Sequence, residues 1–212
     1  MLKLTAASAD SMREGGIPMP AELYENRTKN DLDRALRQLL EDRPLDQIRV
    51  RELTALCGIR RQSFYYHFPD VYALFDWSLR QEAAGLAARQ ERCLTWRQAM
   101  TDLLGHIGRH RRYYQALLKS RGRTGLRTLL QDAYGGLVPR ALEYYRRRGG
   151  GDPDPERDQT DSLCWETLLL SLAEAWAWEE AAQPPEKLLL PLETLLRQGS
   201  LGEAWQNLGN AE

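Results

Sequence analysis

The richest group of hydrogen-bonding and positively charged side chains lies between Arg49 and His67. Four arginines occur in this stretch against a single acid, Glu52. Guanidinium groups pair with phosphate oxygens, and with amides and hydroxyls they can also reach base edges in a major groove. Together with a lysine from upstream, the candidate contacts are Lys29, Arg49, Arg51, Arg60, Arg61, Gln62, Ser63, Tyr65, Tyr66 and His67. This pattern predicts binding to double-stranded DNA.

Two histidines offer the other chemistry that residue spacing allows. His106 and His110 lie four residues apart, so on a helix they share one face and could hold a metal ion. No Glu follows the first histidine as in metalloproteases, and Gly108 weakens a helix between them. We therefore expect two solvated or pocket-lining histidines and no metal. The sequence has no nucleophile motif and no phosphate- or dinucleotide-binding glycine loop, so we expect no cofactor and no enzyme activity.

The elements that would position the candidate contacts have the proportions of a helix-turn-helix. We predict short helices over about 50–57 and 60–67, separated by a turn at Gly58. Phe64 and Phe68 fall on one face of the second helix and would anchor it to a core. The polar residues would then point outward, as a helix that enters a major groove requires.

Longer helices are expected on both sides of this pair. One is predicted to begin at Thr28, whose spacing to Asp31 is that of a capping box, and to end before Pro44. Its apolar stripe consists of Leu32, Leu36, Leu39 and Leu40. A further long helix is predicted to begin at Asp70, directly after the helix-turn-helix.

The remainder of the chain has helical periodicity. The predicted helices lie near 95–108, 110–120, 124–147, 157–182 and 185–198. Pro139 should kink the third of them, and breaks are expected at 149–155 and at Gln183-Pro184-Pro185. No run of alternating β-branched residues predicts a strand. The expected fold class is therefore all-α, with an N-terminal three-helix helix-turn-helix domain followed by a larger C-terminal helical bundle.

Composition limits the class of protein. The chain has 212 residues, 42% of them hydrophobic, and a formal net charge of −1, so it is globular and any attraction to DNA must be local. Its three cysteines form no CxxC pair, which favours a reducing cytoplasm. The sequence shows no signal-peptide pattern and no run of about 18 apolar residues, so no membrane partner is expected. We divide the chain into a flexible arm (1–26), a DNA-binding domain (27–72) and a dimerisation and signal-sensing domain (73–212).

The stretch from Ile48 to Phe68, and above all its Ser-Phe-Tyr-Tyr-His-Phe core, resembles the N-terminal DNA-binding domain of the TetR family of regulators. The resemblance is strong over about 28–79 and continues beyond it as helix order and length. It implies a homodimer that binds a near-palindromic operator. In such proteins the Tyr-x-His-Phe region contacts phosphates and bases, which by position implies roles for Tyr65, Tyr66 and His67.

Two departures from the family pattern stand near the recognition helix. Such proteins often carry a Lys at the start of the fourth helix, where this chain has Val71. They commonly have a capping Ser before the recognition helix, where this chain has Arg60, whose side chain cannot cap. We expect the nearby arginines, or Lys29, to compensate for the missing phosphate contact.

Two C-terminal segments resemble the subgroup of regulators of dihydroxyacetone kinase operons. They are 113–120 and Trp176-Ala177-Trp178 followed by Pro184-Pro185-Glu186. We expect a regulator, on balance a repressor, that responds to a small molecule; the alternative is a protein co-regulator and an activator. A sealed apolar pocket would favour the first, and a filled core with an exposed apolar patch the second. The expected pocket residues are Trp96, His106, Tyr113, Tyr114, Tyr134 and Trp165.

The last two predicted helices are expected to form the dimer interface as a four-helix bundle with their two-fold mates. Both carry apolar residues over more than one face, so one face is left for a partner. Similar regulators dimerise through their last two long helices. The predicted interface residues are Leu168, Leu169, Leu172, Trp176, Leu188, Leu192, Leu195 and Leu196.

Overall fold

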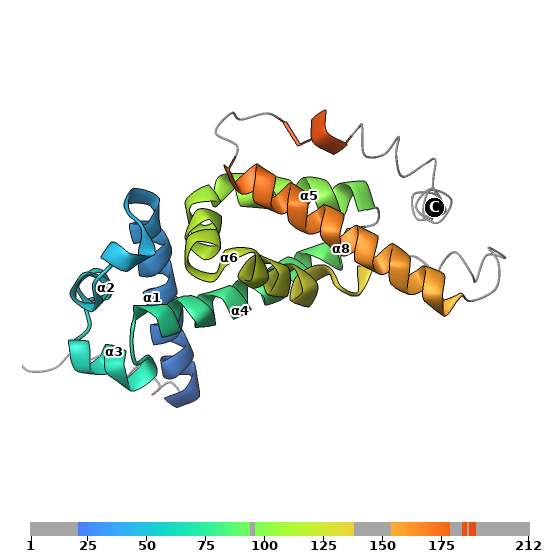
Figure 1. Ribbon diagram of the computed structural model, residues 1–212. Coiled ribbons are helices and arrows are strands. Elements are labelled where there is room, and N and C mark those ends of the chain that lie inside the picture. The colour runs from blue at the N-terminus through green and yellow to red at the C-terminus, as the bar shows by residue number, and fades with distance from the viewer. Residues whose placement is uncertain (1–20, 94–95, 138–153, 179–183, 186, 190–212) are drawn as a thin grey trace, which may run out of the picture.

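The computed structural model describes residues 21–93, 96–137, 154–178, 184–185 and 187–189. Helices account for every regular element among these residues, and none of the described segments forms a strand, so the predicted all-α class is confirmed. Figure 1 shows two groups of helices. Helices α1, α2 and α3 gather at one end, α5, α6 and α8 form the body, and α4 runs from the first group into the second.

Helix α1 spans Ala21–Asp42. Its predicted stripe of four leucines is buried as expected, with Leu32 and Leu36 fully enclosed. The predicted start at Thr28 is wrong, because the helix already includes Ala21 to Arg27, residues assigned in part to a flexible arm. The reason is intrinsic preference: Ala21, Glu22 and Leu23 favour the helix and extend it past the local capping signal. Residues 1–20 lie outside the described part of the chain.

The helix-turn-helix forms where it was expected. A short 3₁₀ turn, η1 (Leu45–Gln47), follows α1, and then come α2 (Val50–Cys57) and α3 (Arg61–His67). Helix α4 covers Val71–Gln90 and begins at Asp70, whose side chain accepts a 2.8 Å hydrogen bond from the backbone N–H of Ala73. Only three residues therefore separate α3 from the long helix that enters the body.

The body is built from α5 (Trp96–Arg109), α6 (Arg111–Tyr134) and α8 (Pro155–Trp178). Element α6 comprises two helices joined across a kink at Gly122, whose φ is 62°, so the predicted break between 110–120 and 124–147 is present at this residue. A left-handed backbone favours glycine because a Cβ atom is strained there. The kink expected at Pro139, the 149–153 part of the predicted loop and most of the predicted 185–198 helix lie outside the described residues.

Polar side chains at the centre of the molecule join both groups of helices. The buried carboxylate of Glu82 on α4 accepts hydrogen bonds from Arg37 on α1 (2.9 Å) and from Tyr114 on α6 (2.8 Å). It also lies 2.5 Å from Nε2 of His106 on α5. The guanidinium of Arg37 sits 4.3 Å above the ring centre of Tyr113. We call Arg37, Glu82, His106, Tyr113 and Tyr114 the central network.

The ionisation of Glu82 reflects these partners. Burial alone raises the pKa of a carboxyl group, but the hydrogen bond with His106 and the positive charge of Arg37 outweigh it and lower the pKa of Glu82 to about 2. The buried phenol of Tyr114 moves the other way, because burial and the neighbouring Glu82 both raise its pKa. The carboxylate is therefore ionised at neutral pH, as a buried charge with several donors can be.

No described helix combines the length and the apolar character that crossing a bilayer demands.

Candidate nucleic-acid interface

The turn between α2 and α3 is set by a glycine. Gly58 ends α2 in the left-handed conformation, at φ 64° and ψ 27°, and its N–H donates to the carbonyl of Ala55. The next N–H, of Ile59, donates 3.0 Å to the carbonyl of Thr54, so the last turn of α2 keeps its acceptors satisfied. Arg60 then precedes α3 in an extended conformation and makes no side-chain cap, as the sequence predicted.

Helix α3 is anchored by one face and exposed on the other. Phe64 is fully buried and Phe68 nearly so, which fixes the helix against the core. On the opposite side Tyr65 is 56% exposed and Tyr66 78% exposed, values that are unusual for tyrosines packed only for stability. The His67 ring is half-buried and lies edge-on to the ring of Tyr66, 5.0 Å away.

The other predicted contacts surround this exposed face. Gln62 and Ser63 lie on α3 and are exposed, as are Arg51 on α2 and Arg49 just before it. Lys29 lies on α1 and is half-buried. The structure thus gathers most of the predicted set on and beside α3, and whether these residues contact DNA stays a prediction.

Glu52, the single acid between Arg49 and His67, is paired within the protein. One carboxylate oxygen of Glu52 lies 2.7 Å from the guanidinium of Arg43, and the other accepts a 3.0 Å hydrogen bond from the backbone N–H of Arg49. Its negative charge is therefore balanced within the fold. Within the described residues, neither Arg60 nor Arg61 pairs with a carboxylate. Their charges remain available to a polyanion.

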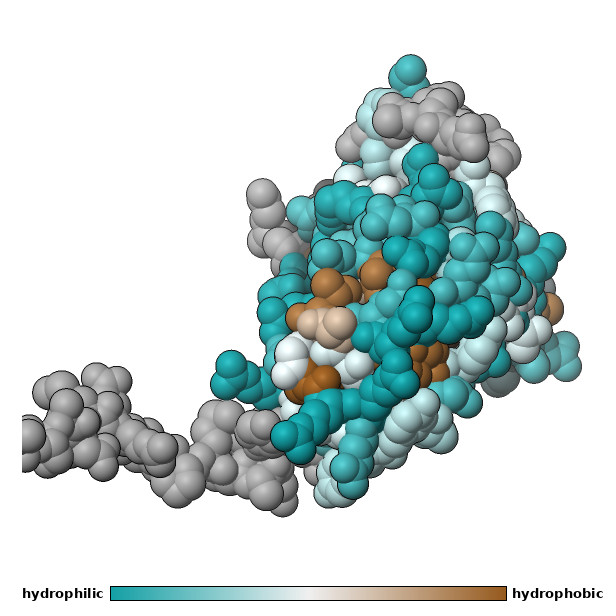
Figure 2. Space-filling model, turned by 90° about the vertical axis from the view of Figure 1, so that its left-hand side faces the viewer, coloured by the Kyte–Doolittle hydropathy of each residue, from teal (hydrophilic) through white to brown (hydrophobic). Residues whose placement is uncertain are grey.

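Figure 2 views the molecule from the end formed by α1, α2 and α3. This face is mainly hydrophilic, with a few small hydrophobic patches broken up by polar side chains. Leu56 on α2 is one exposed apolar residue of this group of helices, at 49%. A surface of this kind suits phosphate and base-edge contacts better than a large apolar interface.

The predicted ligand-pocket residues occupy different environments. His106, Tyr113 and Tyr114 are buried in the central network. Tyr134 is also buried and lies beside a small cavity between α6 and α8. Trp96 begins α5 and Trp165 lies within α8, and their side chains are outside the described part.

The two histidines with metal-binding spacing are neighbours, their ring centres 4.5 Å apart. The imidazole of His106 is bound to Glu82, and burial together with His106 lowers the pKa of His110. Among the described residues, no group of three or more His, Cys, Asp or Glu could hold a metal ion.

The predicted dimer residues divide between the inside and the surface of the subunit. Leu169 and Trp176 are each only 4% exposed, and the indole of Trp176 donates 2.6 Å to the carbonyl of Leu104, so their own subunit covers them. They have almost no surface left for a second copy. Leu168, Leu172 and Leu188 are half-buried, whereas Leu192, Leu195 and Leu196 lie outside the described residues.

The predicted interface set left out two exposed residues of α8, and sequence reasoning missed the connection through Arg37. Leu163 is 58% exposed and Trp178 45% exposed, so they offer apolar surface that Leu169 and Trp176 do not. Arg37 and Glu82 are 45 positions apart, and no local pattern announces their pairing. The one signal in the sequence that could have suggested this pairing is the position of Arg37 on the inner side of a leucine-rich helix.

The chain shares its fold with two solved regulator structures. No protein-family model and no curated protein matches the sequence. Among solved structures, the chain is similar to a dihydroxyacetone kinase operon activator, DhaS, with TM-score 0.62 and 16% identity over 81% of this chain and 94% of that one. It is also similar to a TetR-family regulator from Streptomyces coelicolor, with TM-score 0.61 and 18% identity over 86% and 92% of the two chains. Both are named as regulators of transcription or of an operon, and the TetR-like fold indicated by the Ser63–Phe68 motif is confirmed.

Proposed function

We propose that the protein is a transcriptional regulator that binds a near-palindromic DNA operator as a homodimer, with α3 as the recognition helix. The observation that carries this proposal is the two-sided character of α3. Buried Phe64 and Phe68 hold it rigidly, while the exposed tyrosines and unpaired arginines face outward. A short helix with an anchored back and a polar front meets the geometric requirement of the major groove.

The roles within the recognition helix follow from position. Arg60 and Arg61 stand at its N-terminal end, which in helix-turn-helix proteins enters the groove first. Arg61 and Gln62 are proposed to reach base edges there, and Arg60, just before the helix, is proposed to contact a phosphate. Tyr66 and His67 stand at the other end, where the duplex backbone passes, and are proposed to contact phosphates.

The dimer is proposed to form through α8 and the segment that follows it. Exposed Leu163 and Trp178, with half-buried Leu168 and Leu172, add apolar surface to the side of α8 that its own subunit leaves partly open. A two-fold interface is the commonest way to cover such a side. In the DNA-bound dimer the two recognition helices are then expected about 34–36 Å apart, on successive major grooves.

Selection from random duplex DNA, followed by a gel shift on the enriched sequence, tests this proposal. We expect an inverted repeat whose affinity drops in Arg61→Ala and stays unchanged in Arg127→Ala. Arg127 is a matched control, because it is an exposed arginine on α6 with no carboxylate partner in the described structure. Enrichment of no sequence, or equal binding by both variants, would contradict the proposed recognition helix.

A further inference from the structure

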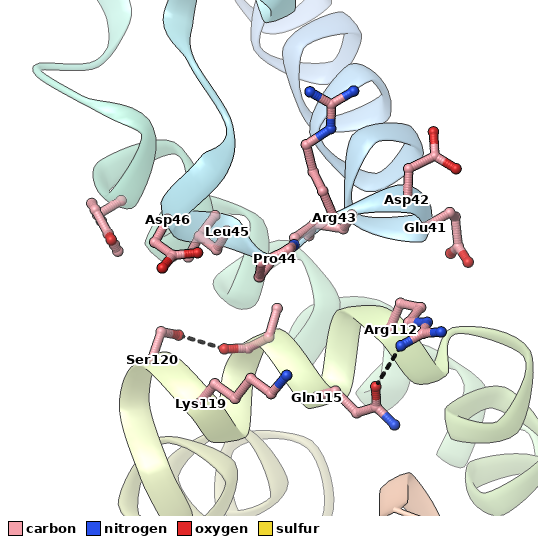
Figure 3. Close-up of a pocket in the computed structure, with 13 residues that line it drawn as sticks. Glu41, Asp42, Arg43, Pro44, Leu45, Asp46, Arg112, Gln115, Lys119 and Ser120 are labelled. Atoms are coloured by element: carbon pink, nitrogen blue, oxygen red, sulfur yellow. Dashed lines mark hydrogen bonds between the residues drawn. The ribbon is translucent and has the colours of Figure 1, made fainter. Parts of the chain in front are cut away.

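A cleft separates the DNA-binding helices from the body. It has a volume of about 580 Å³, within the range of small-molecule sites. One wall is the end of α1 with the η1 turn, and the other is the first half of α6 (Figure 3). Buried Leu40, Leu45 and Ala116 contribute apolar lining. The cleft is distinct from the central network, none of whose residues lines it.

The two walls carry opposite charges. Glu41, Asp42 and Asp46 lie on the α1 side, and Arg112 and Lys119 lie on α6. Within the described residues none of these carboxylates forms an ion pair. All five of these residues are exposed, and the Glu41 and Asp46 side chains point toward α6 across the cleft, whereas the Asp42 carboxylate is turned away from it (Figure 3).

Neighbouring groups leave this separation of charge intact. The guanidinium of Arg43 is turned away from α6 in Figure 3 and pairs with Glu52, so it does not neutralise the acidic wall. On the other wall, within the described part of the chain, the Arg112 side chain makes one long hydrogen bond, of 3.5 Å, to the side chain of Gln115. Lys119 lies 5.9 Å above the ring centre of Trp178, a contact that keeps its full charge.

The described geometry favours a ligand with two charged ends. A purely anionic molecule would meet the Glu41 and Asp46 carboxylates, and a purely cationic one would meet Arg112 and Lys119. A molecule with an ammonium group, an apolar middle and a carboxylate places each end against its opposite charge and its middle against the leucines. Charge-assisted hydrogen bonds at both ends then add to apolar contact between them.

We propose that the cleft binds a small zwitterion, its cationic end on the acidic wall and its anionic end on Arg112 and Lys119. Because the walls belong to the two groups of helices, the bound zwitterion bridges them and favours one relative placement. Its effect on operator affinity rests on the proposed function. A ligand shifts that affinity only by its difference in affinity for the two placements.

Isothermal titration calorimetry of the full chain without DNA tests the site. The probes are 4-aminobutyrate, 6-aminohexanoate and 8-aminooctanoate, which differ in the spacing of the two charges, with hexylamine and hexanoate as single-charge controls. We expect at least one amino acid of this series to bind, and Lys119→Met and Asp46→Asn each to weaken it by about tenfold or more, as loss of one charged hydrogen bond predicts. Arg127→Ala should bind like the wild type.

Three results overturn the zwitterion site: no binding by any probe of the series at millimolar concentration, equal binding by hexylamine or hexanoate, or unchanged affinity in both charge variants. A gel shift with and without the bound probe then separates the two proposals. Binding of a probe by a protein that selects no DNA sequence would overturn the proposed function and leave the site standing. Operator binding that a bound probe does not alter would overturn the regulatory role of the site.

Discussion

Arg61 on α3 and Arg37 in the central network stand in opposite environments. Arg61 on α3 is exposed and pairs with no carboxylate in the described structure, so its donors are left for a partner molecule. Arg37 on α1 is tied to Asp33 at 2.9 Å, to Glu82 at 2.9 Å and to the ring of Tyr113. The comparison shows that an arginine in a DNA-binding region supports a DNA contact only if its side chain is not already paired within the protein.

Substitutions in the two regions should also change different quantities: stability in the central network and DNA affinity on α3. An exposed charge contributes little to folding, because water solvates it nearly as well as any partner does. A buried pair is different, since removal of one member leaves the other without its partner in a poorly solvating interior. Changes in the central network should therefore lower stability, whereas changes at the exposed residues of α3 should lower DNA affinity with little effect on stability.

The largest expected effect is on folding. Glu82→Gln removes the charge that Arg37 and His106 share, and we expect it to lower the free energy of unfolding by about 3 kcal/mol at pH 7. Urea unfolding followed by circular dichroism, at one protein concentration, measures the change. Arg61→Ala is the control and should differ from the wild type by less than about 0.5 kcal/mol. Equal stability of Glu82→Gln and the wild type would mean that the network does not hold the helices together.

The second prediction concerns acid. The pKa of Glu82 falls from 4.5 in the unfolded chain to about 2 in the folded protein, so its contribution is complete above pH 4.5 and is lost as the pH drops toward 2. We expect the stability difference between the wild type and Glu82→Gln to shrink from about 3 kcal/mol toward zero over that interval. Urea titrations of both proteins at several pH values test it. A difference that stays constant through this interval would argue against an ionised Glu82.

The third prediction concerns the recognition helix. Arg61→Ala should weaken operator binding by about 1–3 kcal/mol if the side chain reads a base, and should relax specificity at one position only. Binding to a set of operators with single base changes measures both effects. A uniform loss on all sequences would instead identify a phosphate contact at Arg61.

The smallest expected effect is at Arg60, where one substitution should change stability and operator affinity in opposite directions. Arg60 precedes α3 in an extended conformation and makes no cap, so Arg60→Ser should stabilise the protein by about 1 kcal/mol through a hydrogen bond to an N-terminal N–H. The same change should weaken operator binding and reduce its dependence on salt by about one released counterion. Thermal unfolding and gel shifts at several salt concentrations measure the pair. A stabilised variant with unchanged operator affinity would remove Arg60 from the interface.

Local patterns predicted the helix-turn-helix well, because its determinants are close in the sequence. Gly58, the spacing of Phe64 and Phe68, and the Asp70 cap each act within one turn of their own position. The start of α1 was misplaced, since a capping signal at Thr28 competes with favourable helix formers upstream.

Predictions that depend on distant packing were less successful. An apolar stripe on α8 shows that several leucines need covering, but not whether the same subunit or a second one covers them. Leu169 and Trp176 prove to be covered internally. The cleft likewise depends on how the end of α1 stands against α6, and no pattern along the chain encodes that distance.

The position of Arg37 has a consequence for exchange of modules between proteins. The α1–α3 helices are not an independent structural unit, because Arg37 on α1 donates to Glu82, which lies in the second half of α4. A chimaera that joins residues 21–72 to the body of another regulator would be sound only if that body offers a carboxylate at the place of Glu82. Without such a carboxylate, Arg37 would have to be replaced by an apolar residue. The DNA-binding helices and the body would therefore have to be redesigned together.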